Sequence, residues 1–170
     1  MIFGDQKYFA IECLMLKGDH DYNLIRTRII FKKIHIGNFE ELAVSGTIIL
    51  AITSFLKFGD HQVGEFQSEE EMYKKIYSEM YGDKWKIGLM ENFRDKFSLH
   101  DIFELSIADE GHIMLLVRLP SGKSKVLLGD RSGKYNEYID LPTGYVEKIL
   151  GEIQIWIEKE SQKLRFDSAM

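Results

Sequence analysis

Residues 1–12 read MIFGDQKYFAIE, and this stretch decides how the rest of the chain is interpreted. It is apolar from its first residue, turns at Gly4-Asp5, and continues into a segment typical of a strand. A loose terminal segment would be polar, so we expect this one to be tied into the core. Side chains of a strand alternate between its two faces. One face of the predicted first strand, with the sheet built beside it, consists of Phe9, Ile11, Cys13 and Met15.

The size and composition of the chain are those of one globular domain. A chain of 170 residues is long enough to bury a core without disulfides, so we expect residues 1–170 to form a single domain that frays over residues 165–170. The hydrophobic share of 45% and the charged share of 29% are ordinary for this class. Cys13 is the single cysteine, which excludes an internal disulfide, and we interpret it as a small buried apolar side chain.

The charge and hydropathy of the chain exclude several classes of function. A net charge of −5 argues against general nucleic-acid binding, which needs a basic surface. The longest strongly apolar run, residues 47–58, is too short to cross a bilayer, and the N-terminus lacks the pattern of a signal peptide. We therefore predict a cytoplasmic protein that binds neither nucleic acid nor a membrane.

Two strands and a helix are expected after the first strand. Residues 24–36 predict a long strand with a bulge or break near Lys32-Lys33, because the apolar side chains change phase there. A short strand is expected over residues 39–44. Residues 45–58 predict a helix that is apolar almost all round, so we expect it to be largely buried.

A second helix has the clearest start in the sequence. Ser68 with Glu71 three residues later forms a capping box. Glu70 and Lys74 have the i,i+4 spacing of a stabilising ion pair on the exposed side. The opposite side of this helix carries Met72, Tyr73, Ile76, Tyr77 and Met80.

The second half of the chain predicts a meander of strands and a final helix. Residues 82–98 lack a period and are expected to form a loop with at most a short helical piece. Glycine-containing links between apolar runs indicate antiparallel hairpins. The predicted strands are residues 99–107, 112–119, 124–129 and 135–140. The run 112–119 is apolar on both faces, so we expect it to be central and covered on both sides.

The last helix is expected to start at Pro142-Thr143, because proline is tolerated in a first helical turn. Its apolar stripe, which should face the sheet, consists of Val146, Ile149, Leu150, Ile153, Trp156 and Ile157. The fold class that follows is α+β. We predict a mostly antiparallel β-sheet with two helices inserted after the first strands and one C-terminal helix packed on the sheet.

Searches for catalytic and metal-binding motifs leave two weaker alternatives. No two histidines have the i,i+4 spacing of a metal pair and no CxxC motif is present, so we predict neither a metal site nor a cofactor. His61 and His100 each neighbour an aspartate, which leaves open a small hydrolase that uses a His/Asp pair. A ligand-binding or sensor domain could use an apolar cleft around Tyr73, Tyr77 and Trp85, although their spacing favours a core.

Residues 19–23 contain part of a calcium-binding motif. Asp19-x-Asp21-x-Asn23 matches the opening of an EF-hand loop, but Leu24 and Ile30 stand where that loop needs a glycine and a bidentate glutamate. The sequence therefore does not predict a calcium site.

An acidic segment is the surface feature most typical of partner binding. Between Lys57 and Lys74 there is no basic residue, and the carboxylates that fall there are Asp60, Glu65, Glu69, Glu70 and Glu71. The last three could simply complement the helix dipole. Alternatively, the segment forms an acidic face that binds a basic partner, since such charge speeds docking and sets specificity. A smaller basic counterpart lies in the hairpin tips with Lys123, Lys125, Arg131 and Lys134.

The opening stretch also carries a family resemblance. Residues 1–5, a short polar spacer and Phe9-Ala10-Ile11-Glu12 resemble the start of the bacterial immunity protein 42 family, small cytosolic proteins associated with polymorphic toxin systems. The order of later elements is similar too, including the Thr47-led apolar helix and a C-terminal helix with tryptophan.

This resemblance implies a non-enzymatic protein that binds and neutralises a cognate toxin, expected to be encoded by a neighbouring gene. Separately, we expect a monomer or a weak homodimer. Immunity surfaces differ between members of such families, so the resemblance assigns no binding residues here.

Overall fold

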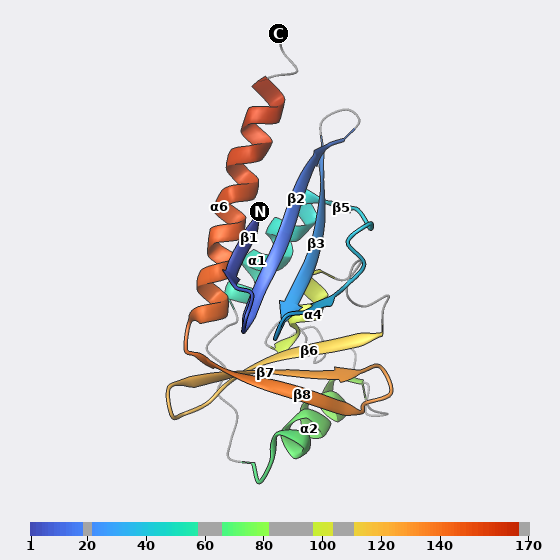
Figure 1. Ribbon diagram of the computed structural model, residues 1–170, viewed down its shortest axis with the longest axis vertical. Coiled ribbons are helices and arrows are strands. Elements are labelled where there is room, and N and C mark those ends of the chain that lie inside the picture. The colour runs from blue at the N-terminus through green and yellow to red at the C-terminus, as the bar shows by residue number, and fades with distance from the viewer. Residues whose placement is uncertain (19–21, 58–65, 82–96, 104–110, 167–170) are drawn as a thin grey trace.

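The computed structural model describes residues 1–18, 22–57, 66–81, 97–103 and 111–166 (Figure 1). A first antiparallel sheet contains β1 (Ile2–Asp5), β2 (Phe9–Lys17), β3 (Asn23–Phe31), β4 (Ile34–Ile36) and β5 (Ala43–Val44). A second contains β6 (His112–Arg118), β7 (Lys123–Asp130) and β8 (Tyr135–Pro142). The helices are α1 (Ser45–Lys57), α2 (Glu69–Tyr81), α4 (Leu99–Ile102) and α6 (Tyr145–Phe166). The predicted α+β class is confirmed. The strands were expected to form one sheet, but they form two separate sheets.

The N-terminal stretch forms the first hairpin of the first sheet. Gly4 adopts a φ of +95°, which favours glycine, and β1 pairs with β2 so that Phe3 lies opposite Ile11. The N-terminal ammonium donates a 2.7 Å hydrogen bond to the Cys13 carbonyl. Phe9, Ile11 and Cys13 are fully buried, as predicted. Burial raises the pKa of the Cys13 thiol to about 12, which agrees with an apolar core role.

The predicted long second strand is a hairpin. Lys32 and Lys33 have φ values of +48° and +71°, so the chain reverses there in the manner of a tight hairpin turn, and β4 pairs back on β3. Ile36 lies opposite Ile29 and is buried, whereas Ile34 at the hairpin end is 57% exposed. The strand expected over residues 39–44 is confirmed only at Ala43–Val44.

Helices α1 and α6 cover the inner face of the first sheet. Ile48, Ile52 and Phe55 of α1 are buried, but Leu50 is 71% exposed and most of the helix is intermediate or exposed, so the expectation that this helix is largely buried was wrong. In α6 the predicted stripe packs inward; its Trp156 is partly buried and makes an edge contact with Phe3.

The start of α6 corrects a second expectation. The helix begins at Tyr145, after Gly144 with a φ of +80°, whereas Pro142 is the last residue of β8. The helix continues to Phe166. Of the predicted frayed end, residues 167–170 lie outside the described part of the chain.

The second sheet separates two hydrophobic cores. Met114 and Leu116 of β6 face the large core with the first sheet, α1 and α6, while Leu115 and Val117 face the smaller core under α2. The expectation that this strand is covered on both sides is confirmed. It is wrong that the strand is central, because β7 is the middle strand and β6 lies beside it. Figure 1 shows α2 on the far side of this sheet from α6.

The strand expected over residues 99–107 was also wrong where the structure describes it. Residues 99–102 form the short helix α4, and Leu99, Ile102 and Phe103 are buried. Their spacing of three and four places them on one side of a helix. Residues 104–107, and residues 82–96 of the expected loop, lie outside the described residues.

Candidate partner-binding surface

The first turn of α2 holds the described part of the acidic segment. The Glu71 N–H donates to Ser68 Oγ over 3.2 Å, which confirms Ser68 as the helix cap. The Glu71 carboxylate accepts a 2.9 Å hydrogen bond from the Gln67 N–H, one residue earlier than in a standard capping box. Glu71 thus has a structural role at the start of the helix.

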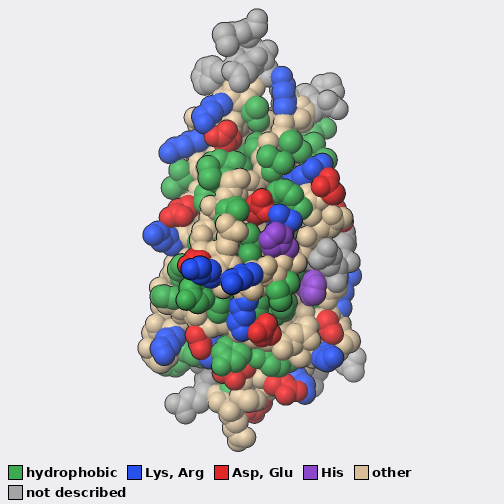
Figure 2. Space-filling model, in the orientation of Figure 1, with side chains coloured by type: hydrophobic (Ala, Val, Ile, Leu, Met, Phe, Trp, Pro, Cys, Tyr) green, Lys and Arg blue, Asp and Glu red, His purple; other side chains and the backbone are tan. Residues whose placement is uncertain are grey.

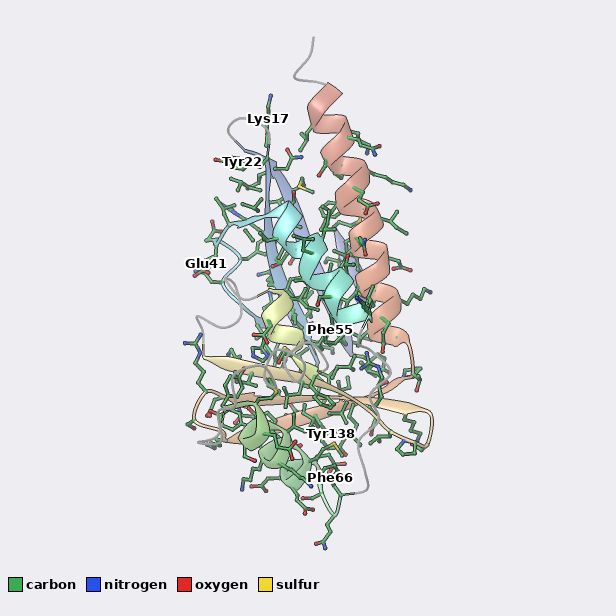
Figure 3. The ribbon with its side chains drawn as sticks, turned by 180° about the vertical axis from the view of Figure 1, so that it is seen from behind. Lys17, Tyr22, Glu41, Phe55, Phe66 and Tyr138 are labelled. Atoms are coloured by element: carbon green, nitrogen blue, oxygen red, sulfur yellow. The ribbon has the colours of Figure 1, made fainter. Side chains whose placement is uncertain are left out.

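Glu69 takes part in an ion-pair network with the second sheet. Its Oε1 lies 3.0 Å from Lys125 Nζ, which also lies 2.6 Å from Asp140 Oδ1 and 4.3 Å from the centre of the Tyr138 ring. Tyr138 is labelled in Figure 3. A hydrogen bond from its own backbone N–H, and then the bond from Lys125, lower the pKa of Glu69. Burial lowers the pKa of Lys125, but its hydrogen bonds to Asp140 and Glu69 outweigh this, and the net pKa is raised. The acidic and basic segments of the sequence therefore meet inside this chain.

Glu70 is more available to a partner. Its only ion pair among the described residues is with Lys74 on the same helix, at 2.6 Å, and both side chains are more than half exposed. This confirms the i,i+4 pair expected from the sequence. Asp60 and Glu65, the other members of the acidic segment, lie outside the described residues. On the face shown in Figure 2, acidic and basic side chains are interspersed rather than segregated.

Tyrosine side chains of α2 attach this helix to the second sheet. The Tyr73 hydroxyl donates to the Asp130 carbonyl over 3.3 Å, and the Tyr77 hydroxyl donates to the Arg131 carbonyl. Gly129 makes room for this packing, since a Cβ there would lie 2.2 Å from Tyr73 Cζ. Tyr73 is fully buried, and burial raises its pKa. Tyr73 therefore belongs to a packed core and not to a cleft, and Trp85 of the sensor alternative lies outside the described residues.

His100 is a packed core residue. It is 2% exposed, its Nε2 lies 2.8 Å from the Tyr81 hydroxyl, and its Nδ1 lies 3.1 Å from the Met114 carbonyl oxygen. Asp101 is 3.6 Å from Nε2. This imidazole ties α4 to α2 and β6, which does not favour the hydrolase alternative. His61 lies outside the described residues, and among the described ones no group of three or more His, Cys, Asp or Glu side chains could hold a metal ion.

The contact of Lys125 with Glu69 and Asp140 could not be predicted from the sequence. Glu69 and Lys125 are far apart in the chain, and only the packing of α2 on the second sheet brings them together. The i,i+4 and capping contacts were predictable because they are local.

The described polar side chains of this α+β scaffold form helix caps, ion pairs and core hydrogen bonds. The comparison with known families is specific: the chain belongs to the Immunity protein 42 family, whose model matches residues 1–156. It is therefore an immunity protein.

The fold resembles a solved structure. The crystal structure of CdiI from Burkholderia dolosa AUO158 superimposes with a TM-score of 0.64 and 13% identity, covering 90% of this chain and 97% of that one. At this identity the likeness shows a shared fold. No curated protein matches the sequence. Within the described residues, no helix has the length and hydropathy needed to cross a membrane.

Proposed function

We propose that this immunity protein binds and neutralises a cognate toxin of a polymorphic, contact-dependent toxin system. The family match over residues 1–156 is the observation that carries the proposal. The partner is a toxin domain encoded by a neighbouring gene, and binding occurs in the cytoplasm. The protein acts without catalysis, because neutralisation of a toxin needs only a complementary surface with a few buried anchor residues. It acts as a monomer or a weak homodimer.

The proposal is tested by rescue of growth. The toxin domain encoded beside this gene is expressed from an inducible promoter in cells that carry this protein or an empty vector. We expect growth to stop with the vector and to continue with the protein. Equal growth arrest in both strains, with the protein present at a level above that of the toxin, would contradict the proposal.

The acidic segment Asp60, Glu65, Glu69, Glu70 and Glu71 remains our prediction for part of the toxin-binding surface. Glu70 is the best residue for a test, because its ion pair with Lys74 is exposed and lies within α2, whereas Glu69 binds Lys125 of the second sheet and Glu71 binds the Gln67 N–H before the helix. We expect Glu70→Lys to slow association with the toxin several-fold at low salt, since exposed interface charges act mainly on the association rate. Stopped-flow mixing at two salt concentrations measures this.

Glu79→Lys is the matched control for this variant. Glu79 is exposed near the other end of α2, and its reversal changes the net charge by the same amount. If both reversals slow association equally, net charge alone acts and the first turn of α2 is not part of the surface.

A further inference from the structure

Strand β8 forms one edge of the second sheet. The strand order of this sheet is β6-β7-β8, so β8 has a hydrogen-bonded strand neighbour on one side only. Figure 1 shows the three strands, with β7 between β6 and β8. An edge strand with free N–H and C=O groups is a template to which another chain can add a strand.

The hydrogen bonds of the β7–β8 hairpin show which peptide groups of β8 face the open edge. At the turn, the Asp130 N–H donates to the Lys134 carbonyl over 3.0 Å. Bonding to a given neighbour alternates along an antiparallel strand, so residues 124, 126 and 128 of β7 also bond to β8. They lie opposite residues 141, 139 and 137. The N–H and C=O groups of Tyr138 and Asp140 therefore point away from β7, toward the open edge.

These outward groups of Tyr138 and Asp140 have room for a partner strand. No residue that the structure describes forms a hydrogen bond with them. At one end of the edge, Asn136 is an extra residue in the pairing of β7 with β8. At the other end, Pro142 has no N–H to donate. The open edge therefore accepts a short strand centred on residues 138–140.

The charges beside this edge favour a basic partner strand. The charged residues of β8 are Glu137 and Asp140, whose side chains are 43% and 51% exposed. Lys32 of the β3–β4 turn pairs with Glu137. Asp140, in contrast, shares the ammonium of Lys125 with Glu69, so this network holds more carboxylate than ammonium charge. A basic side chain opposite Asp140 on an added strand would balance the excess.

The other charges near Asp140 are compatible with a basic partner. The positive end of the α2 dipole amounts to about half a charge, and the first turn of α2 contains Glu69, Glu70 and Glu71. Lys32 lies on the other face of β8, because Glu137 and Asp140 point to opposite faces of the strand. A second copy of this chain is disfavoured, since its own β8 would bring like charges to the edge.

We propose that the toxin adds a strand to the open edge of β8 and places an arginine or lysine beside Asp140. Main-chain hydrogen bonds join the toxin strand to Tyr138 and Asp140, and its basic side chain completes the network with Lys125 and Glu69. This inference rests on the proposed function and names the binding mode and the chemistry of the partner. It extends the predicted acidic surface from Glu69 on α2 to β8.

The test is toxin affinity measured by calorimetry with two variants of Asp140. Asp140→Asn removes the charge and keeps the outward N–H, whereas Asp140→Pro removes both, and proline is tolerated on an edge strand. We expect binding to weaken about threefold for Asp140→Asn and at least about tenfold for Asp140→Pro. The difference arises because the lost N–H leaves a toxin acceptor without its hydrogen bond.

Lys17→Pro is the matched control on the first sheet. The Cys13 N–H donates to the Met1 carbonyl, so by the same alternation the Lys17 N–H points to the open edge of β2. Lys17 is exposed, and its proline variant should bind the toxin with wild-type affinity. If Lys17→Pro and Asp140→Pro weaken binding equally, the effect is not specific to β8 and strand addition there is overturned.

Amide hydrogen exchange of the wild-type protein decides if Asp140→Pro folds poorly. The Tyr138 and Asp140 amides should exchange at least about tenfold more slowly in the toxin complex than in the free protein, while the Ile139 amide is slow in both. Unchanged exchange at Tyr138 and Asp140 in the complex would overturn strand addition while leaving the proposed function standing. Protection of the same amides in the concentrated free protein would assign the edge to a second copy and overturn the toxin strand. Failure of the wild-type protein to bind the toxin would overturn both.

Discussion

Lys125 is the residue on which the contact between α2 and the second sheet concentrates. Its ammonium lies within 3.0 Å of Glu69 on the helix and within 2.6 Å of Asp140 on the neighbouring strand. Its own side chain is only 13% exposed, so this network is less screened than an ordinary surface ion pair. The network therefore makes the attachment of α2 depend on pH.

The Glu69→Gln variant tests this dependence. Because folding lowers the pKa of Glu69 below its usual 4.5, the ionised group stabilises the fold above about pH 4.5. That contribution is lost as the pH falls through the lowered pKa. We expect Glu69→Gln to melt at a lower temperature than the wild type at pH 7, and the difference to shrink below pH 4.5. A difference that stays constant from pH 7 to about pH 3 would contradict this assignment.

Contacts between individual residues could be predicted from the sequence only where the two residues are close together in the chain. The Ser68 cap and the Glu70–Lys74 pair were predictable, since both lie within one turn of a helix. The Glu69–Lys125 contact joins residues more than fifty positions apart, and no local pattern encodes it.

At the scale of elements, the packing of α2 on β7 depends on a missing side chain. Gly129→Ala would place a Cβ 2.2 Å from Tyr73 Cζ and 2.6 Å from the Lys134 carbonyl oxygen. Neither the buried ring nor the backbone can move easily, so we expect a loss of about 1–3 kcal/mol in the free energy of unfolding. Urea denaturation measures it.

Gly46→Ala is the control for that variant. Gly46 is helical and has open space around its Cβ position, so alanine should be neutral or should stabilise by up to about 1 kcal/mol. Equal unfolding midpoints for Gly129→Ala and the wild type would show that α2 does not pack tightly against β7 in solution.

Elements were predictable where a long periodic pattern or a strong punctuating residue was present. The buried face of β2, the start of α2 and the apolar stripe of α6 are of this kind. The short helix α4 was missed, because four residues are too few to show a helical period. The division into two sheets was missed as well, since strand pairing between distant segments is set by the tertiary structure.

On the scale of the whole molecule, a partly buried ion pair joins the second sheet to α6. Arg118 at the end of β6 donates from Nε to Glu147 Oε1 over 2.6 Å, and Glu147 belongs to α6, which covers the first sheet. The Arg118 side chain is 7% exposed, and its two terminal nitrogens have no hydrogen-bond partner among the described residues. The Glu147 carboxylate is therefore the main group that offsets the cost of burying the Arg118 guanidinium.

A double-mutant cycle tests this link. Glu147→Leu leaves the guanidinium buried and unpaired, so we expect a loss on the order of 3 kcal/mol, and Arg118→Met is the second single variant of the cycle. Arg118→Met with Glu147→Leu removes both charges, and the double variant should be more stable than the sum of the single losses predicts. Additive losses in chemical denaturation would mean that the two charges do not interact in solution.

The opening stretch explains why the family could be predicted while the toxin-binding surface could not. Phe9 and Ile11 are fully buried and Gly4 makes a turn, so the recognisable motif belongs to the scaffold. The shared fold with CdiI at 13% identity is likewise a property of the scaffold. Partner specificity depends on exposed residues. Folding does not constrain which residues stand at exposed positions, so no sequence pattern marks the toxin-binding surface.

Calorimetric titration with the toxin domain that we expect to be encoded beside its gene is the most direct test of toxin binding by this immunity protein. We expect a complex of one toxin per chain with a dissociation constant of about 10 nM or tighter, because the inhibitor must outcompete the toxin's target. Absence of binding at concentrations of about 10 μM, with both proteins shown to be folded, would contradict it.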